Sequence, residues 1–132
     1  MTLPLFAGDP FARSKVCPSS TEVAIARLIW AHDGWKNPIS IAEIIQHSEI
    51  SGLDARRVKK VVEQLRTTHH VAVGARREFP AGYYRIVTEE DLLKAIGPYR
   101  SQILTMLRVL RGLMPKSYLR ELRGQLRLVE SE

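Results

Sequence analysis

The chain has 132 residues, 45% of them hydrophobic and 26% charged, with a net charge of +6, which fits one soluble domain. No run reaches 18 apolar residues and residues 1–11 have no basic segment, so the sequence predicts neither a transmembrane helix nor a signal peptide, and no membrane partner. Cys17 is the only cysteine, which excludes an intrachain disulfide and favours a cytoplasmic location.

The first part of the chain predicts an arm followed by a helix. Residues 1–18 contain three prolines and no sustained hydrophobic period, so we expect an N-terminal arm that is partly disordered. A helix is predicted over about residues 21–31, because Ser19 or Ser20 can cap it and its apolar positions form one wide face.

Two further helices are predicted from their capping residues. Ser40 and Glu43 form an S-x-x-E capping box, which stabilises a helix start by about 1 kcal/mol, and that helix ends near residues 47–48. Asp54 is expected to cap a third helix that runs to about residue 66. Its apolar residues have amphipathic helical spacing and are Val58, Val61, Val62 and Leu65.

A β-hairpin and more helices follow. Residues 71–73 and 83–87 are rich in β-formers and are separated by a basic, glycine- and proline-containing loop, with Arg76 and Arg77 at its tip. Thr88 is expected to cap a further helix. Gly97-Pro98 predicts a break or sharp kink, since an interior proline costs about 3 kcal/mol, and a new helix is predicted from Pro98 to about residue 113. After Pro115, residues 118–129 are predicted to form a last helix.

These elements predict a mainly α fold with a small β-hairpin, arranged as a winged helix-turn-helix with additional C-terminal helices. The expected divisions are an arm at 1–18, a winged-helix DNA-binding domain at 19–88 and C-terminal helices at 89–132. In this layout the third helix enters the major groove of DNA, and the hairpin, or wing, reaches phosphates or the minor groove.

The charge pattern supports a polyanionic partner. Residues 54–132 carry 16 basic and 9 acidic groups, whereas residues 1–53 carry 4 and 5. A solvated helix face and a plain surface loop are the alternative interpretations of the basic residues. The residues predicted to bind double-stranded DNA are Ser51, Arg56, Arg57, Lys59, Lys60, Gln64, Arg76 and Arg77. Arginine can bond both acceptors of guanine, and Gln64 could read adenine.

The chain also resembles a known family. Residues 39–87 look like the winged-helix DNA-binding superfamily, and residues 82–92, GYYRIVTEEDL, leading into a long basic helix, are similar to small winged-helix proteins of phages and mobile elements. The resemblance implies that Ser51, Arg56, Arg57, Lys60 and the wing arginines face DNA. It also implies a role in transcription regulation or DNA replication, although some members use this fold only for protein contacts.

The C-terminal helices predict a partner or a packing role. Apolar residues from Leu92 to Leu113 repeat in steps of four and three, a heptad pattern. We expect a homodimer, and its predicted interface residues are Tyr99, Ile103, Met106 and Leu110. Packing of the same residues into the domain's own core remains the alternative.

No catalytic, cofactor or metal motif is present in the sequence, so we expect a protein that is not an enzyme and has no cofactor. The four histidines and one cysteine lack zinc-binding spacing, and His69-His70 is interpreted as a capping or cationic pair at a helix end. The alternative function is a winged-helix module that binds an acidic protein of a replication or transcription assembly. A single-strand or RNA binder is a third possibility, disfavoured because exposed aromatic residues are expected to be few.

Overall fold

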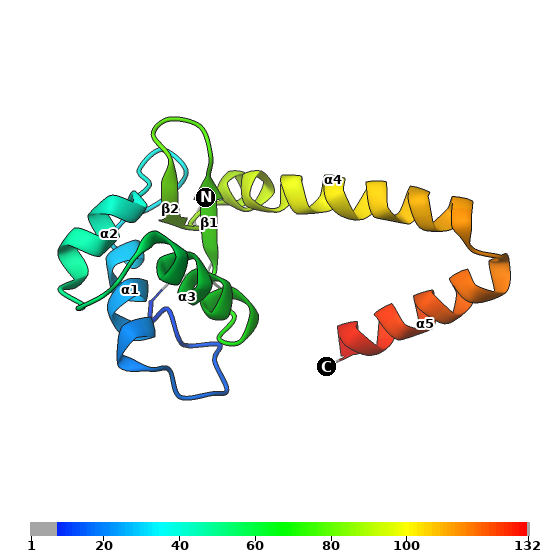
Figure 1. Ribbon diagram of the computed structural model, residues 1–132, viewed down its shortest axis with the longest axis horizontal. Helices are drawn as coiled ribbons and strands as arrows, with labels where there is room; N and C mark the ends of the chain where they lie inside the picture. Colours follow the sequence, from blue (N-terminus) through cyan, green and yellow to red (C-terminus); the bar gives the residue numbers. More distant parts are fainter. Residues whose placement is uncertain (1–7, 132) are drawn as a thin grey trace. The chain divides into compact units, whose positions relative to one another are not determined.

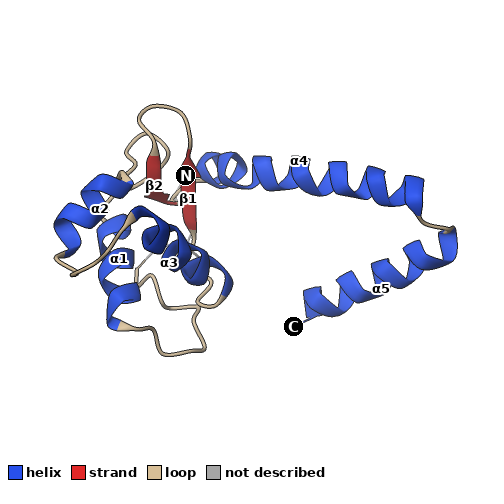
Figure 2. Ribbon diagram, viewed as in Figure 1, coloured by secondary structure: helices blue, strands red, loops and turns tan. Residues whose placement is uncertain are grey.

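The computed structural model describes residues 8–131. The helices are α1 (Ser20–Trp30), α2 (Ile41–Ser48), α3 (Ala55–Thr67), α4 (Glu89–Leu113) and α5 (Lys116–Ser131), and the strands are β1 (Val73–Arg76) and β2 (Gly82–Arg85) (Figure 1). The protein is therefore mainly helical with one small antiparallel hairpin in the described part of the chain, as predicted (Figure 2). It divides into two compact units, one ending at Ala95 and the other beginning at Ile96.

Side-chain caps fix the start of each of the first three helices. Ser19 and Glu22 form a capping box at α1, and Ser40 and Glu43 form the predicted one at α2. At α3 the Asp54 carboxylate accepts a hydrogen bond of 2.8 Å from the backbone N–H of Arg57. Each cap satisfies a backbone donor that the helix itself leaves free.

The core of the first unit lies where α1, α2 and α3 meet the hairpin. Ile25, Ile29, Ile44 and Leu65 are fully buried there, and Phe11 from the predicted arm packs against them. The Trp30 indole N–H donates to the Gly8 carbonyl at 2.6 Å, so residues 8–11 are attached to this core. Residues 1–7 of the predicted arm lie outside the described residues.

The hairpin is present, but its strands differ from the predicted ones. The register runs from Val73 opposite Arg85 to Arg76 opposite Gly82, so Arg76 lies in β1 and not at the tip. Gly74 suggested a loop, yet a Cβ atom there would overlap the buried ring of Tyr84, so the strand needs a glycine at this position.

A third segment also pairs with the hairpin. Ile39 and Tyr83 exchange two backbone hydrogen bonds, of 2.8 and 2.9 Å, in an antiparallel bridge. Strand β2 is therefore bonded to β1 on one edge and to the segment before α2 on the other. Gly82 permits this approach, because a Cβ atom at that position would overlap the Ile39 carbonyl.

The predicted break at Gly97-Pro98 and the separate helix from Pro98 are wrong, because one helix, α4, runs from Glu89 to Leu113 with Pro98 inside it. The alternative part of that prediction, a sharp kink, stays a prediction. An interior proline lacks the N–H that would bond the carbonyl four residues earlier, here that of Lys94, and its ring crowds that carbonyl. Pro98 and Lys94 are both exposed residues. The predicted cap is present, because the Thr88 hydroxyl accepts a hydrogen bond from the Asp91 N–H at 3.1 Å.

The second unit consists of the rest of α4 and α5. Between Ile96 and Leu128 every side chain is exposed or only partly buried, although many of them are apolar. Helix α5 begins at Lys116, two residues earlier than expected, and the Pro115 carbonyl accepts the Tyr118 N–H at 3.1 Å. Residues 96–128 therefore present apolar surface without a core of their own.

Candidate nucleic-acid interface

Helix α3 separates its side chains into a buried apolar face and an exposed basic face. The buried residues are the four predicted ones, Val58, Val61, Val62 and Leu65. The exposed residues include Arg56, Arg57, Lys59, Lys60 and Gln64. No other residue of the described part of the chain, 8–131, forms an ion pair with the side chains of these four cations.

The turn between α2 and α3 positions the start of this basic face. Glu49 adopts a left-handed conformation with φ of 56°, and Gly52 does so with φ of 75°. Leu53 is buried and holds the turn on the core, while Ser51 remains exposed beside the first turn of α3. Ser51, Arg56 and Arg57 are all exposed at or just before the N-terminal turn of α3.

A surface hollow of about 470 Å³ lies between α3 and the start of α1. On the α3 side it is lined by Arg57, Lys60 and Gln64, and on the α1 side by Ser19 and Glu22, among others. Three of the predicted DNA-binding residues are therefore grouped around one concave surface. Glu22 adds a negative charge to its opposite wall.

Arg76 has a different environment from the one predicted. Its guanidinium donates to the Trp35 carbonyl at 3.0 Å and to the Phe79 carbonyl at 3.1 Å, and its central carbon lies 4.8 Å from the centre of the Trp35 ring. The side chain is half-buried. Arg76 therefore fastens the hairpin to the turn after α1, whereas Arg77 is exposed at the end of the strand.

Phe79, which lies in the loop between β1 and β2, is not among the residues predicted to bind DNA. Its side chain is 93% exposed, and its neighbours Glu78 and Pro80 are exposed as well. The signal available in the sequence was a Phe-Pro pair inside an otherwise polar loop.

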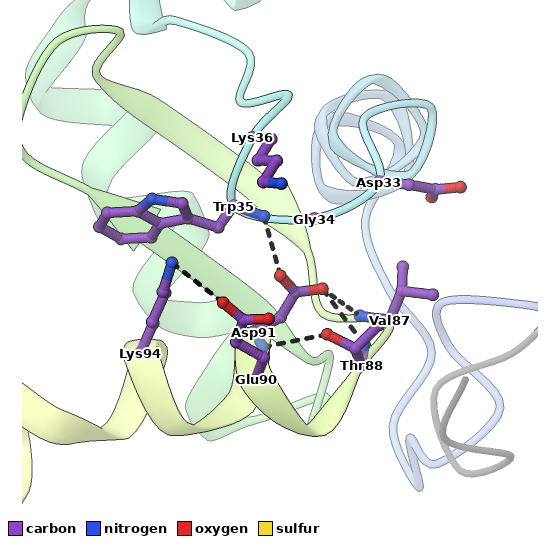
Figure 3. A pocket seen from close by; sticks show the side chains of 9 residues that line it. All are labelled: Asp33, Gly34, Trp35, Lys36, Val87, Thr88, Glu90, Asp91 and Lys94. Carbon is purple, nitrogen blue, oxygen red and sulfur yellow. Dashed lines mark hydrogen bonds and ion pairs between the residues drawn. The ribbon is translucent and has the colours of Figure 1, made fainter. Parts of the chain in front are cut away.

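A pocket of about 310 Å³ forms where the turn after α1 meets the start of α4 (Figure 3). Asp91 lies at its centre, and its carboxylate accepts the backbone N–H groups of Trp35 at 3.0 Å and of Val87 and Thr88 at 3.2 Å. Burial alone would raise the pKa of Asp91, but these hydrogen bonds hold it below its ordinary value. The carboxylate thus joins the two segments as an ionised acceptor.

Trp35, which lines this pocket, contacts Lys94 on one side and Tyr84 on another. The Lys94 ammonium lies 5.0 Å from the centre of the Trp35 ring and 3.5 Å from the Glu90 carboxylate. Trp35 packs edge-on against Tyr84, and burial together with the Asp91 charge raises the pKa of Tyr84 to about 12. Because the polar atoms of Asp91 are already bonded to the protein, the pocket supports the hairpin rather than presenting a free ligand group.

His69 does not cap a helix, which was one of its two predicted roles, and the other, a cationic side chain, stays a prediction. Its side chain is 2% exposed, with Nε2 2.6 Å from a Glu22 oxygen and Nδ1 2.7 Å from the Ser14 hydroxyl. The Phe11 ring packs edge-on against the imidazole. The histidine therefore connects the end of α3 with α1 and the N-terminal segment, all of which are distant in sequence.

The predicted dimer residues lie on one side of α4. Tyr99, Ile103 and Met106 are each more than half exposed, and Leu110 is partly buried. These residues belong to the second unit, so the dimer contact and the alternative, packing into the domain's own core, both stay predictions.

Within residues 8–131, no group of three or more acidic, histidine or cysteine side chains is arranged to hold a metal ion. None of the helices in this described range is long and apolar enough to cross a membrane. Comparisons with protein-family models, curated proteins and solved structures find no match to this chain.

Proposed function

We propose that this chain is a winged helix-turn-helix protein that binds double-stranded DNA, with α3 in the major groove and the β1–β2 hairpin as the wing. The observation that carries the proposal is the basic face of α3, where Arg56, Arg57, Lys59 and Lys60 are exposed and have no acidic partner among the described residues. Such side chains are available to phosphates and base edges.

The order and pairing of the elements support the same fold. A winged helix needs three helices followed by a hairpin, and the bridge between Ile39 and Tyr83 lies where such a fold has a short strand between its first and second helices. The exposed position of Arg77 suits a wing contact with phosphate. A cytoplasmic role in transcription regulation or DNA replication is part of this proposal.

We further propose that two copies associate through α4. The exposed apolar residues Tyr99, Ile103 and Met106 would pack against the same residues of a second copy. Recognition of a symmetric site would require the α3 helices of the two copies to lie about one helical turn of DNA apart.

A salt titration tests DNA binding. The logarithm of the affinity for duplex DNA should fall with the logarithm of salt concentration, by about 0.9 per phosphate neutralised. The triple change Arg56→Ala, Arg57→Ala and Lys60→Ala should reduce both affinity and slope. The control Arg27→Ala removes one exposed positive charge from α1 and should leave both nearly unchanged. No duplex binding at low salt would refute the proposal.

The second candidate function is a protein-interaction module. The exposed apolar side chains between Ile96 and Leu128 favour it, since surface of this kind is typical of contact sites. The basic residues Lys116, Arg120, Arg123 and Arg127 of α5 recur in steps of four and three, which would suit an acidic partner. A chain that binds no duplex DNA at low salt would favour this second function.

A further inference from the structure

The loop between β1 and β2 carries Phe79, the most exposed large apolar side chain among the described residues. A phenyl ring that is 93% exposed contributes nothing to the core of its own domain. The neighbouring Pro80 is exposed too, so the tip of the wing presents two apolar residues, and the exposed cation Arg77 and the exposed acid Glu78 precede them. An apolar tip suits a site between stacked rings, and Arg77 offers one positive charge to a phosphate beside that site.

The backbone at this tip is held firmly. Arg76 donates one hydrogen bond to the Phe79 carbonyl and another to the Trp35 carbonyl, and it lies over the Trp35 ring. The residue that carries the phenyl ring is therefore tied to the body of the first unit through a single guanidinium. A side chain displayed on such a support loses less conformational entropy on binding than one on an unattached loop.

Base steps in the minor groove of duplex DNA have the matching chemistry. Phenylalanine and proline wedges enter between adjacent base pairs there, unstack them partially and kink the duplex, and the narrow groove attracts arginine. We propose that Phe79 inserts between two base pairs in the minor groove beside the major-groove site of α3, with Arg77 on the adjacent backbone. This inference rests on the proposed DNA binding and assigns the wing tip a role in deforming the DNA.

The test uses the full chain and duplexes selected by the wild-type protein from a random pool. Adenines along one such duplex are replaced singly by 2-aminopurine, whose fluorescence rises when it unstacks. With wild-type protein we expect a rise of about severalfold at one step outside the α3 site. Phe79→Ala should abolish that rise and lower affinity by about tenfold, whereas Phe79→Leu should retain part of both.

The controls separate the wedge from general effects. Val16→Ala truncates another exposed apolar side chain of the same unit and should change neither readout. Because Phe79 is outside the core, Phe79→Ala should melt at the wild-type temperature, and Arg56→Ala should still weaken its binding.

Three results would overturn the inference. If the wild-type protein binds the duplex and Phe79→Ala matches it in affinity and fluorescence, the wedge is wrong and DNA binding stands. If the wild-type protein binds no duplex, both fail together. If it prefers the single strand of the same sequence and Phe79→Ala removes that preference, the ring stacks on unpaired bases instead.

Discussion

The Nε2 atom of His69 lies 2.6 Å from a carboxylate oxygen of Glu22, and this contact joins the end of α3 to the capping box of α1. Glu22 therefore stabilises one helix locally and attaches another at long range. Burial alone would raise the pKa of Glu22, but hydrogen bonds from Ser19 and His69 lower it below its ordinary value of 4.5.

This lowered pKa predicts a specific loss of stability in acid. A group whose pKa is lower in the folded state contributes stability that is complete above its unfolded pKa and is lost as the pH falls through the folded one. The free energy of unfolding should therefore decrease below about pH 4.5. Glu22→Gln should lower it by about 1–2 kcal/mol at neutral pH and reduce its acid dependence, measured by urea unfolding at several pH values.

A matched control exists in α2. Glu43 occupies the same capping-box position, and its carboxylate bonds to Ser40. Because glutamine also serves in a capping box, Glu43→Gln should cost only a few tenths of a kcal/mol. Equal losses in both variants would mean that the contact with His69 contributes nothing.

Two arginines should have different effects on DNA recognition. Arg56→Ala in α3 is expected to reduce discrimination between a selected site and random duplex by about 1–3 kcal/mol, if the side chain reads a guanine. Arg77→Ala in the wing should weaken binding to both duplexes to a similar extent, because phosphate contacts carry no sequence information. Competition titrations measure both effects. Uniform weakening by Arg56→Ala would show that α3 does not read bases.

Arg76 should behave as a structural residue, unlike its neighbour Arg77. Arg76→Ala removes two hydrogen bonds to carbonyls and the contact with Trp35, so the free energy of unfolding should fall by about 1–2 kcal/mol. Exchange of the backbone amides of residues 77–79 and 81 should also become faster. Arg77→Ala is the control and should alter neither quantity, since its side chain is exposed. Equal stability of the two variants would contradict this assignment.

The apolar side of α4 makes a prediction about assembly. The double change Ile103→Glu and Leu110→Glu would place two charges in the proposed dimer contact, at a cost of several kcal/mol if they are buried there. The variant should sediment as a monomer, keep its helical circular dichroism and bind a single half-site weakly. Ser101→Glu with Thr105→Glu, two exposed polar positions of the same helix, should leave association intact. A wild-type protein that is monomeric at micromolar concentration would disprove the dimer.

Local interactions explain which elements could be predicted from the sequence. The starts of α2 and α3 were correct because Ser40, Glu43 and Asp54 act on backbone groups within three residues of themselves. The four buried residues of α3 followed from helical spacing alone. These features need no knowledge of the rest of the fold.

The errors arose where distant residues decide the outcome. Gly74 reads as a loop residue, but the Tyr84 ring on the opposite strand determines its place in β1. His69 acquires its role from Glu22, 47 positions away in sequence. The environment of Arg76 likewise depends on Trp35, and no local sequence pattern indicates that these two residues meet. The role of Arg76 could therefore be assigned only from the structure.

The way the wing is attached determines which of its residues can change without loss of the fold. Arg76 donates a hydrogen bond to the backbone carbonyl of Phe79, a group that every amino acid possesses. All side chains from residue 77 to residue 81 are exposed. Mutations in this five-residue tip therefore incur little penalty in folding. Natural or engineered substitutions in this loop could therefore change what the tip binds without changing the fold that supports it.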